Sequence, residues 1–189
     1  GVNKYEFITM DGSPLPPATA GAHIDVVIMP DVIRQYSLSG DPGDTSKYQI
    51  GVLCEDEGRG GSKMMHHTFN PGRKVVISYP INHFPLEELA SKTYLMGGGI
   101  GITPMIAMAY RLHAIGGDFV LHYSCSTREA AGFLEDLSQV PWADKVHLHF
   151  SSEGTRIDLN EVLGNYLEGN HLYTCGADRY MSAVLETAE

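Results

Sequence analysis

The alternation of apolar and polar residues changes its period about halfway along the chain. Before residue 86, short apolar stretches recur with a period of two, as at Ile24, Val26 and Ile28, and glycine, proline or aspartate residues separate them. Alternate residues of a strand share a face, so this pattern predicts strands over 2–10, 21–29, 34–38, 48–53 and 74–79. Short strands at nearly regular spacing are typical of a small antiparallel barrel.

After residue 91, strand-like segments alternate with segments of helical period. Met105, Met108, Ala109 and Leu112 recur at helical spacing, and Gly116-Gly117 should end that helix. We predict strands over 92–96, 119–123, 145–150 and 171–174, with helices over 103–115, 128–137, 158–167 and from 178 onward. Such alternation indicates a doubly wound parallel sheet. The expected fold therefore has two domains, an antiparallel β-barrel over 1–90 and a parallel α/β domain over 91–189.

Composition and charge exclude several classes of protein. Thirteen basic and twenty-three acidic residues give a net charge of −10, which disfavours binding to nucleic acid or to an anionic membrane surface. No apolar run approaches the roughly 18 residues that a membrane-spanning helix needs. The three cysteines, Cys54, Cys125 and Cys175, lack the spacing of a disulfide framework or a metal site. We therefore expect a cytoplasmic protein, monomeric, with no nucleic-acid or membrane partner.

No metal site is expected from the histidines either. His147 and His149 fall on one face of a predicted strand, but the sequence offers no evident third ligand.

The segment Arg34-Gln35-Tyr36-Ser37-Leu38 combines three kinds of side chain within one predicted strand. The guanidinium of Arg34 can fork onto a phosphate, Tyr36 offers a flat aromatic surface, and Ser37 offers a hydroxyl. From strand alternation we expect the three side chains to meet one ligand, and a flavin mononucleotide (FMN) requires these features. The alternative is an ordinary strand with one exposed arginine.

Two glycine-rich segments are candidate anion sites. Gly58–Ser62 can form a backbone nest for an anion, assisted by Arg59 or Ser62, or it can be a mobile hairpin loop. Gly97–Thr103 lies between a predicted strand and a helix, with Thr103 as the predicted N-cap and Pro104 as the first helical residue. Its backbone N–H groups and the positive end of the helix favour a phosphate. The alternative is a tight turn without a ligand.

The order of the strands brings further residues to this region. Thr103, Arg128 and Cys175-Gly176 follow the carboxyl ends of predicted parallel strands, where α/β proteins bind ligands. Two anion sites on two domains imply two nucleotide-like ligands, an arrangement that suits hydride transfer.

Five motifs occur in order along almost the whole chain: Arg34–Leu38, Gly58–Ser62, Asn82-His83-Phe84-Pro85-Leu86, Gly97–Met105 and Tyr173-Thr174-Cys175-Gly176. Their order and spacing resemble the phthalate dioxygenase reductase family, which includes vanillate O-demethylase oxidoreductases and belongs to the ferredoxin–NADP reductase superfamily. The resemblance implies a six-stranded antiparallel flavin-binding barrel followed by a nicotinamide-binding α/β domain.

The resemblance also implies residue roles. Arg34 would hold the FMN phosphate with Gly60, Gly61 and Ser62, Tyr36 would pack on the isoalloxazine, and Ser37 would reach its N5 atom. The segment from Gly98 through Gly99, Ile100 and Gly101 to Thr103 would hold the NADH pyrophosphate, and Cys175 and Gly176 would border the nicotinamide. The implied catalytic residues are Ser37, Thr103 and Cys175. Further cofactor-binding residues would be Gln35, Val52, Leu53, Phe84 and Arg128.

Members of this family pass electrons from NADH through FMN and a C-terminal [2Fe–2S] ferredoxin domain to a separate terminal oxygenase. A [2Fe–2S] cluster of this type needs four cysteines with a C-x₄-C-x₂-C run, which this chain lacks. We therefore expect the cluster only if a ferredoxin domain lies beyond residue 189. The chain also has Ala177 where the superfamily usually has proline, and Ile81 where a basic residue is expected.

The expected function is that of an oxygenase reductase acting with an oxygenase for an aromatic or similar small substrate. Two alternatives remain open at this level: a ferredoxin or flavodoxin reductase that uses FAD, and a non-catalytic electron-transfer or regulatory module. The choice of NADH over NADPH follows from the resemblance alone. NADPH would require basic residues at its 2′-phosphate, and Arg128 and Arg156 are available for that role, so the residues themselves leave both cofactors open.

Overall fold

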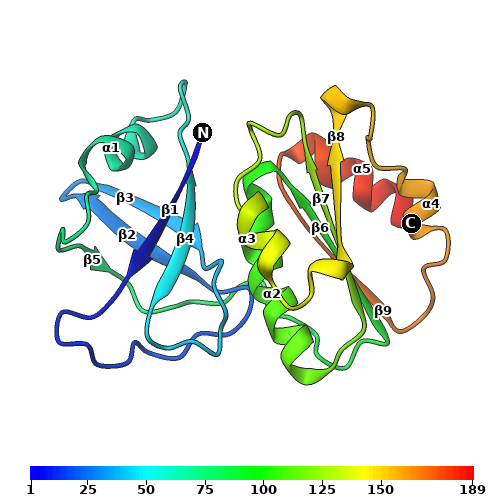
Figure 1. The fold of residues 1–189 in the computed structure, drawn as a ribbon, viewed down its shortest axis with the longest axis horizontal. Helices are drawn as coiled ribbons and strands as arrows, with labels where there is room; N and C mark the ends of the chain where they lie inside the picture. Colours follow the sequence, from blue (N-terminus) through cyan, green and yellow to red (C-terminus); the bar gives the residue numbers. More distant parts are fainter.

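The computed structural model describes residues 1–189 and consists of two halves that lie side by side (Figure 1). The N-terminal half is built from antiparallel strands, and the C-terminal half from a four-stranded parallel sheet with helices. The two-domain fold class predicted from the sequence is confirmed. None of the helices is long and apolar enough to cross a membrane.

The N-terminal half contains β1 (Val2–Phe7), β2 (His23–Met29), β3 (Val32–Ser37), β4 (Tyr48–Leu53), β5 (Val76–Ile77) and one helix, α1 (Gly61–Thr68). Strand β1 pairs with β4, and β3-β2-β5 form a second sheet, with a bridge between Leu38 and Ile50. Ile24, Val26 and Ile28 alternate inward and pack in one core with Ile50 and Met65. The period of two therefore reflects a sheet with one buried face.

Five strands are present where the family resemblance implied six. After β5 the chain makes only an isolated bridge between His23 and Ile81. Pro80 and Pro85 flank this segment, and proline has no N–H group to donate to a ladder, so pairing does not extend further.

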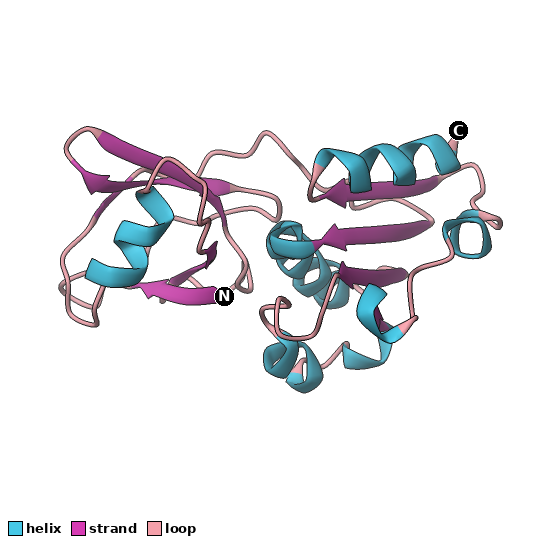
Figure 2. Ribbon diagram, turned by 90° about the horizontal axis from the view of Figure 1, so that it is seen from above, coloured by secondary structure: helices cyan, strands magenta, loops and turns pink.

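The C-terminal sheet contains β6 (Lys92–Gly98), β7 (Phe119–Cys125), β8 (Val146–Phe150) and β9 (Asn170–Cys175), in the order β8-β7-β6-β9. Figure 2 shows helices on both faces of this sheet. They are α2 (Ile102–Ile115), α3 (Leu134–Gln139), α4 (Leu159–Leu163) and α5 (Asp178–Ala188), with short 3₁₀ turns η1 (Gly99–Gly101), η2 (Ala143–Lys145) and η3 (Ser151–Glu153). Because both faces are covered, residues 93–97 of β6 are all buried.

Three predicted helices differ from the structure in detail. Helix α2 begins at Ile102, so Thr103 is not its N-cap; the Thr103 hydroxyl instead donates to the carbonyl of Ile100 at 3.1 Å. The helix predicted over 128–137 exists only as α3, because Phe133 adopts a left-handed conformation with φ 65°. Asp158 does cap α4, accepting a hydrogen bond from the Glu161 amide at 3.1 Å, but that helix ends at Leu163.

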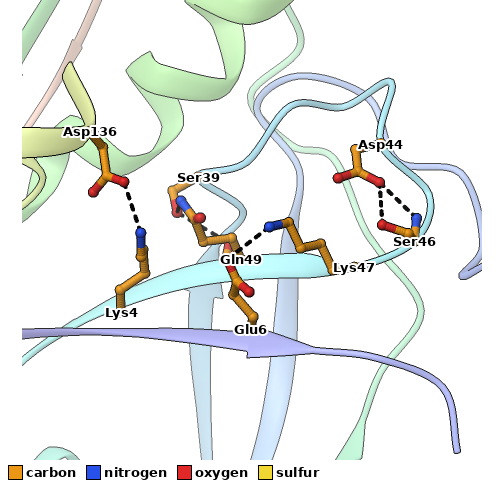
Figure 3. Close-up of polar contacts among 8 residues, drawn as sticks. All are labelled: Lys4, Glu6, Ser39, Asp44, Ser46, Lys47, Gln49 and Asp136. Carbon is orange, nitrogen blue, oxygen red and sulfur yellow. Dashed lines mark hydrogen bonds and ion pairs between the residues drawn. The ribbon is translucent and has the colours of Figure 1, made fainter. Parts of the chain in front are cut away.

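Helices α2 and α3 lie on the side of the parallel sheet that faces the N-terminal half (Figure 1). Ala20 from the N-terminal half belongs to the main core of the C-terminal half, and the Phe84 ring packs edge-on against Tyr173 with centroids 5.5 Å apart. The Lys4 ammonium donates to the Asp136 carboxylate of α3 at 2.8 Å (Figure 3). Apolar packing and an ion pair therefore fix the two halves against each other.

Candidate functional site

The two halves share an open cleft of about 380 Å³, which the carboxyl ends of β6 and β9 and the end of β3 border. Twelve predicted site residues line it: Arg34, Gln35, Tyr36, Ser37, Leu53, Gly61, Ser62, Ile100, Gly101, Thr103, Cys175 and Gly176. Arg59, considered above as an anion ligand, also lines the cleft. The sequence did not single out Gly51 and Glu55, which complete the lining.

Arg34 lies against the beginning of α1. A Cβ atom on Gly61 would be 3.0 Å from Arg34 Nε, so the absence of a side chain at 61 lets the guanidinium approach the helix. Gly60 precedes the helix with φ 84°, a conformation that favours glycine. A guanidinium beside a helix N-terminus is suited to an anion, because both carry positive charge.

Two hydrogen bonds orient the polar groups of this candidate anion site. Arg34 Nη1 donates to the Ile33 carbonyl at 2.8 Å, which leaves its other N–H groups for a ligand. The Ser62 hydroxyl oxygen accepts from the Glu55 amide at 3.1 Å, so its proton remains available to an anion.

Tyr36 reaches the same cleft by strand alternation, as predicted, but Ser37 reaches it for a different reason. Strict alternation would place Ser37 on the opposite face of the strand from Arg34 and Tyr36. Strand β3 ends at Ser37, and Leu38 then pairs with Ile50 of the other sheet, so the chain changes direction there. Burial raises the pKa of the Tyr36 phenol by more than the positive charge of Arg34 lowers it. The Tyr36 side chain is therefore neutral at neutral pH.

On the C-terminal side, glycines allow backbone segments to touch. A Cβ atom on Gly101 would lie 2.5 Å from the Gly176 amide nitrogen and still closer to the Cys175 carbonyl. A Cβ atom on Gly176, where φ is 150°, would lie 2.8 Å from the Gly98 carbonyl oxygen. The end of β9 is therefore packed directly on the turn before α2. Burial raises the pKa of the Cys175 thiol, so it is not a thiolate at neutral pH.

Six predicted residues do not line the cleft. Val52 is fully buried in the N-terminal core, and Phe84 packs at the junction of the two halves. Arg128 forms a bidentate ion pair with Glu153, at 2.7 and 3.1 Å, and lies over the Phe150 ring. The other three are the glycines that shape the two turns, Gly60, Gly98 and Gly99.

A third histidine joins His147 and His149 on the parallel sheet. His122 of β7 hydrogen-bonds through Nδ1 to Nε2 of His149 at 2.9 Å and stacks on His147 with centroids 4.9 Å apart. Burial, followed by the neighbouring histidines, lowers the pKa of His122 to about 4. The sequence could not reveal this cluster, because it depends on the register between β7 and β8. No group of three or more potential ligands has the arrangement of a metal site.

Comparison with known proteins identifies the fold first. No family model matches the chain. The structure of phthalate dioxygenase reductase, described as a modular structure for electron transfer from pyridine nucleotides to [2Fe–2S], superposes with a TM-score of 0.93 and 33% identity over 99% of this chain. The two halves and their shared cleft therefore have the architecture of the ferredoxin–NADP reductase superfamily.

Sequence relatives then define the family. The vanillate O-demethylase oxidoreductase of Pseudomonas sp. (strain HR199) is 46% identical over 98% of this chain, and the carnitine monooxygenase reductase subunit of Escherichia coli (strain K12) is 41% identical over 99%. Over nearly its whole length the chain is therefore similar to oxygenase reductases of the phthalate dioxygenase reductase and vanillate O-demethylase oxidoreductase type. It spans 59% of the length of each of these three proteins.

Proposed function

We propose that this chain is the flavin- and nicotinamide-binding part of an NADH-dependent oxygenase reductase. Bound in the cleft, FMN would accept a hydride from NADH and release single electrons through a [2Fe–2S] ferredoxin centre to a terminal oxygenase. The observation that carries the proposal is the single cleft that joins an arginine-and-helix anion site on one half to a glycine-rich strand end on the other. Hydride transfer needs no general base, so the protein's task is to position two cofactors.

The N-terminal part, residues 1–90, is proposed as the flavin domain. Arg34, with the amides at the start of α1 and the Ser62 hydroxyl, would hold the phosphate, since cation, helix end and donor converge there. Tyr36 offers a neutral ring for stacking, and the Ser37 hydroxyl would donate to or accept from the flavin ring edge. Gln35 and Leu53 also line the cleft. Val52 and Phe84 do not, so they would support the flavin site only through packing.

Residues 91–189 are proposed as the nicotinamide domain. The turn from Gly98 to Thr103 would bind the pyrophosphate through backbone N–H groups, and Cys175 and Gly176 would border the nicotinamide. Glu153 holds the guanidinium of Arg128, which leaves that arginine poorly suited to a 2′-phosphate. Arg156, the other candidate for a 2′-phosphate, forms no ion pair, so the preference for NADH over NADPH is proposed from the similarity to NADH-dependent reductases, and kcat/KM measured with both cofactors tests it.

The names of the relatives support the proposed partner. Two of them are reductase components of an O-demethylase and a monooxygenase, so a terminal oxygenase is the proposed electron acceptor. A [2Fe–2S] cluster would have to come from a ferredoxin domain outside residues 1–189, since the three cysteines here are separate. We also propose a cytoplasmic monomer, which cell fractionation and light scattering test.

Anaerobic titration of the FMN-loaded protein with NADH tests the function. The visible flavin absorbance should bleach stoichiometrically, and ferricyanide should then support turnover. Retention of FMN without bleaching would overturn the proposal, and absence of turnover would favour a non-catalytic module. The mass of the extracted cofactor distinguishes FMN from FAD.

A further inference from the structure

One aromatic ring crosses from the C-terminal half to the N-terminal half beneath the cleft. Phe133 precedes α3, is 8% exposed and is the only non-glycine residue with a positive φ. A Cβ atom on Gly51 of β4 would lie 2.7 Å from both Cε2 and Cζ of this ring. The Phe133 ring therefore occupies the space that a side chain at 51 would need.

The same contact reaches two residues that line the cleft. Gly51 is itself part of the lining, and a Cβ atom there would lie 3.1 Å from Cγ2 of Thr103. Phe133, Gly51 and Thr103 thus meet where β4 of one half approaches the start of α2 in the other. A side chain at 51 would therefore press on residues that belong to both halves.

The position of Phe133 is held from both sides along the chain. The Tyr123 hydroxyl donates to the Gly132 carbonyl at 3.1 Å, and a Cβ atom on Gly132 would lie 2.9 Å from Val2 of β1. Three residues later, Asp136 accepts from Lys4 of the same strand at 2.8 Å (Figure 3). Contacts between the halves therefore flank the ring, and they keep a backbone conformation that is unfavourable for a side chain.

We propose that Phe133 is a positioning residue that, seated on Gly51, sets the separation of the two halves across the cleft. This inference rests on the proposed function, because the quantity it controls is the distance between the flavin and the nicotinamide. Hydride donor and acceptor must approach to about 3–3.5 Å, so a spacing error of one ångström is large on this scale. Phe133 itself touches neither cofactor.

The central variant is Gly51→Ala. Its methyl carbon would start 2.7 Å from two ring atoms, whereas carbon atoms pack at about 3.5–4.0 Å, so the halves or the ring must move by about 1 Å. We expect flavin reduction at saturating NADH to slow by about 10- to 100-fold. FMN affinity and the KM for NADH should stay near wild type, because the anion sites are unchanged.

The double variant Gly51→Ala/Phe133→Leu distinguishes this mechanism from a direct clash between the methyl group and the flavin. Leucine lacks the Cε and Cζ atoms, so it makes room for the methyl group, and most of the lost rate should return. A rate that stays low in the double variant would overturn the proposal. Leu137→Ala is the matched control, because Leu137 lies in the core on α3, the helix that Phe133 precedes; it should lower stability without slowing flavin reduction.

A second measurement needs no cofactor. Urea unfolding is measured for the apo wild type, both single variants and the double variant. The two single changes in unfolding free energy should not add up to the change in the double variant, because residues 51 and 133 are in contact. Additive values would overturn the inference even if NADH reduces the flavin. If the wild type binds FMN but NADH does not reduce it, the proposed function fails, whereas the coupling between 51 and 133 is still measured.

Discussion

Gly101→Ala gives a sharp test of the C-terminal wall of the cleft. The backbone of Gly101 is right-handed, with φ −62°, so alanine is allowed there by conformation. Its methyl group, however, would lie 2.5 Å from the Gly176 nitrogen and closer still to the Cys175 carbonyl. These are backbone atoms, and they cannot turn away as a flexible side chain can.

The size of the effect follows from this overlap. To restore an ordinary contact, the end of β9 must move by about 1 Å from the start of α2, a kind of overpacking that costs about 1–3 kcal/mol of stability. Because Cys175 and Gly176 move with it, kcat/KM for NADH should fall by about 10- to 100-fold. Flavin binding should remain unchanged, because the Arg34 site lies on the other half.

Gly116→Ala is the matched control. Gly116 follows the far end of α2, outside the cleft, with φ 71°, and a Cβ atom added there would meet no other atom within 4 Å, so alanine adds backbone strain of about 1–2 kcal/mol but no clash. Urea unfolding should find similar losses of stability in both variants, whereas anaerobic stopped-flow reduction should find a large loss of kcat/KM only for Gly101→Ala. Equal kcat/KM values for the two variants would refute the argument.

Three further predictions concern other parts of the chain. Arg34→Ala should raise the Kd for FMN by about 10- to 100-fold, because it removes a charge-assisted hydrogen bond to the phosphate. A fluorescence titration measures this change, and Arg73→Ala, which lies outside the cleft, should leave the Kd unchanged. Because the pKa of His122 is about 4 when folded and near 6.5 when unfolded, stability should be complete above pH 6.5 and fall by up to about 3 kcal/mol as the pH drops toward 4. His122→Asn should flatten that dependence in urea unfolding, and parallel curves would contradict the assignment. Asn82→Ala should lower the free energy of unfolding by about 1–2 kcal/mol in thermal unfolding, because Asn82 donates to Thr19 and Ala20 and accepts from the Phe84 amide. A loss no greater than that caused by His83→Ala would contradict this prediction.

Much of the candidate site could be predicted because its signals are local. The motif from Arg34 to Ser37 gathers an arginine, a tyrosine and a serine at the end of one strand, and the glycine turn before α2 includes Gly99, whose φ of 54° favours glycine. Gly51 and Glu55 were missed because they carry no local signal. Gly51 contributes by lacking a side chain, which makes room for Phe133, and Glu55 contributes its backbone amide, which donates to the Ser62 hydroxyl. Arg128 follows the expected strand end, but its pairing with Glu153 depends on where η3 folds back, which sequence spacing does not reveal.

The sequence by itself determined the two periods of apolar residues, the change between them near residue 90, and helix ends such as Gly116, where φ is 71°. These features depend on a few neighbouring residues, whose conformational preferences act before any tertiary contact forms. Only the tertiary structure decided that Gly61 makes room for Arg34, that Phe133 fills the space at Gly51, and that His122 joins His147 and His149. Each of those contacts joins segments distant in sequence, and it exists only once sheet register and the packing of the two halves bring the segments together.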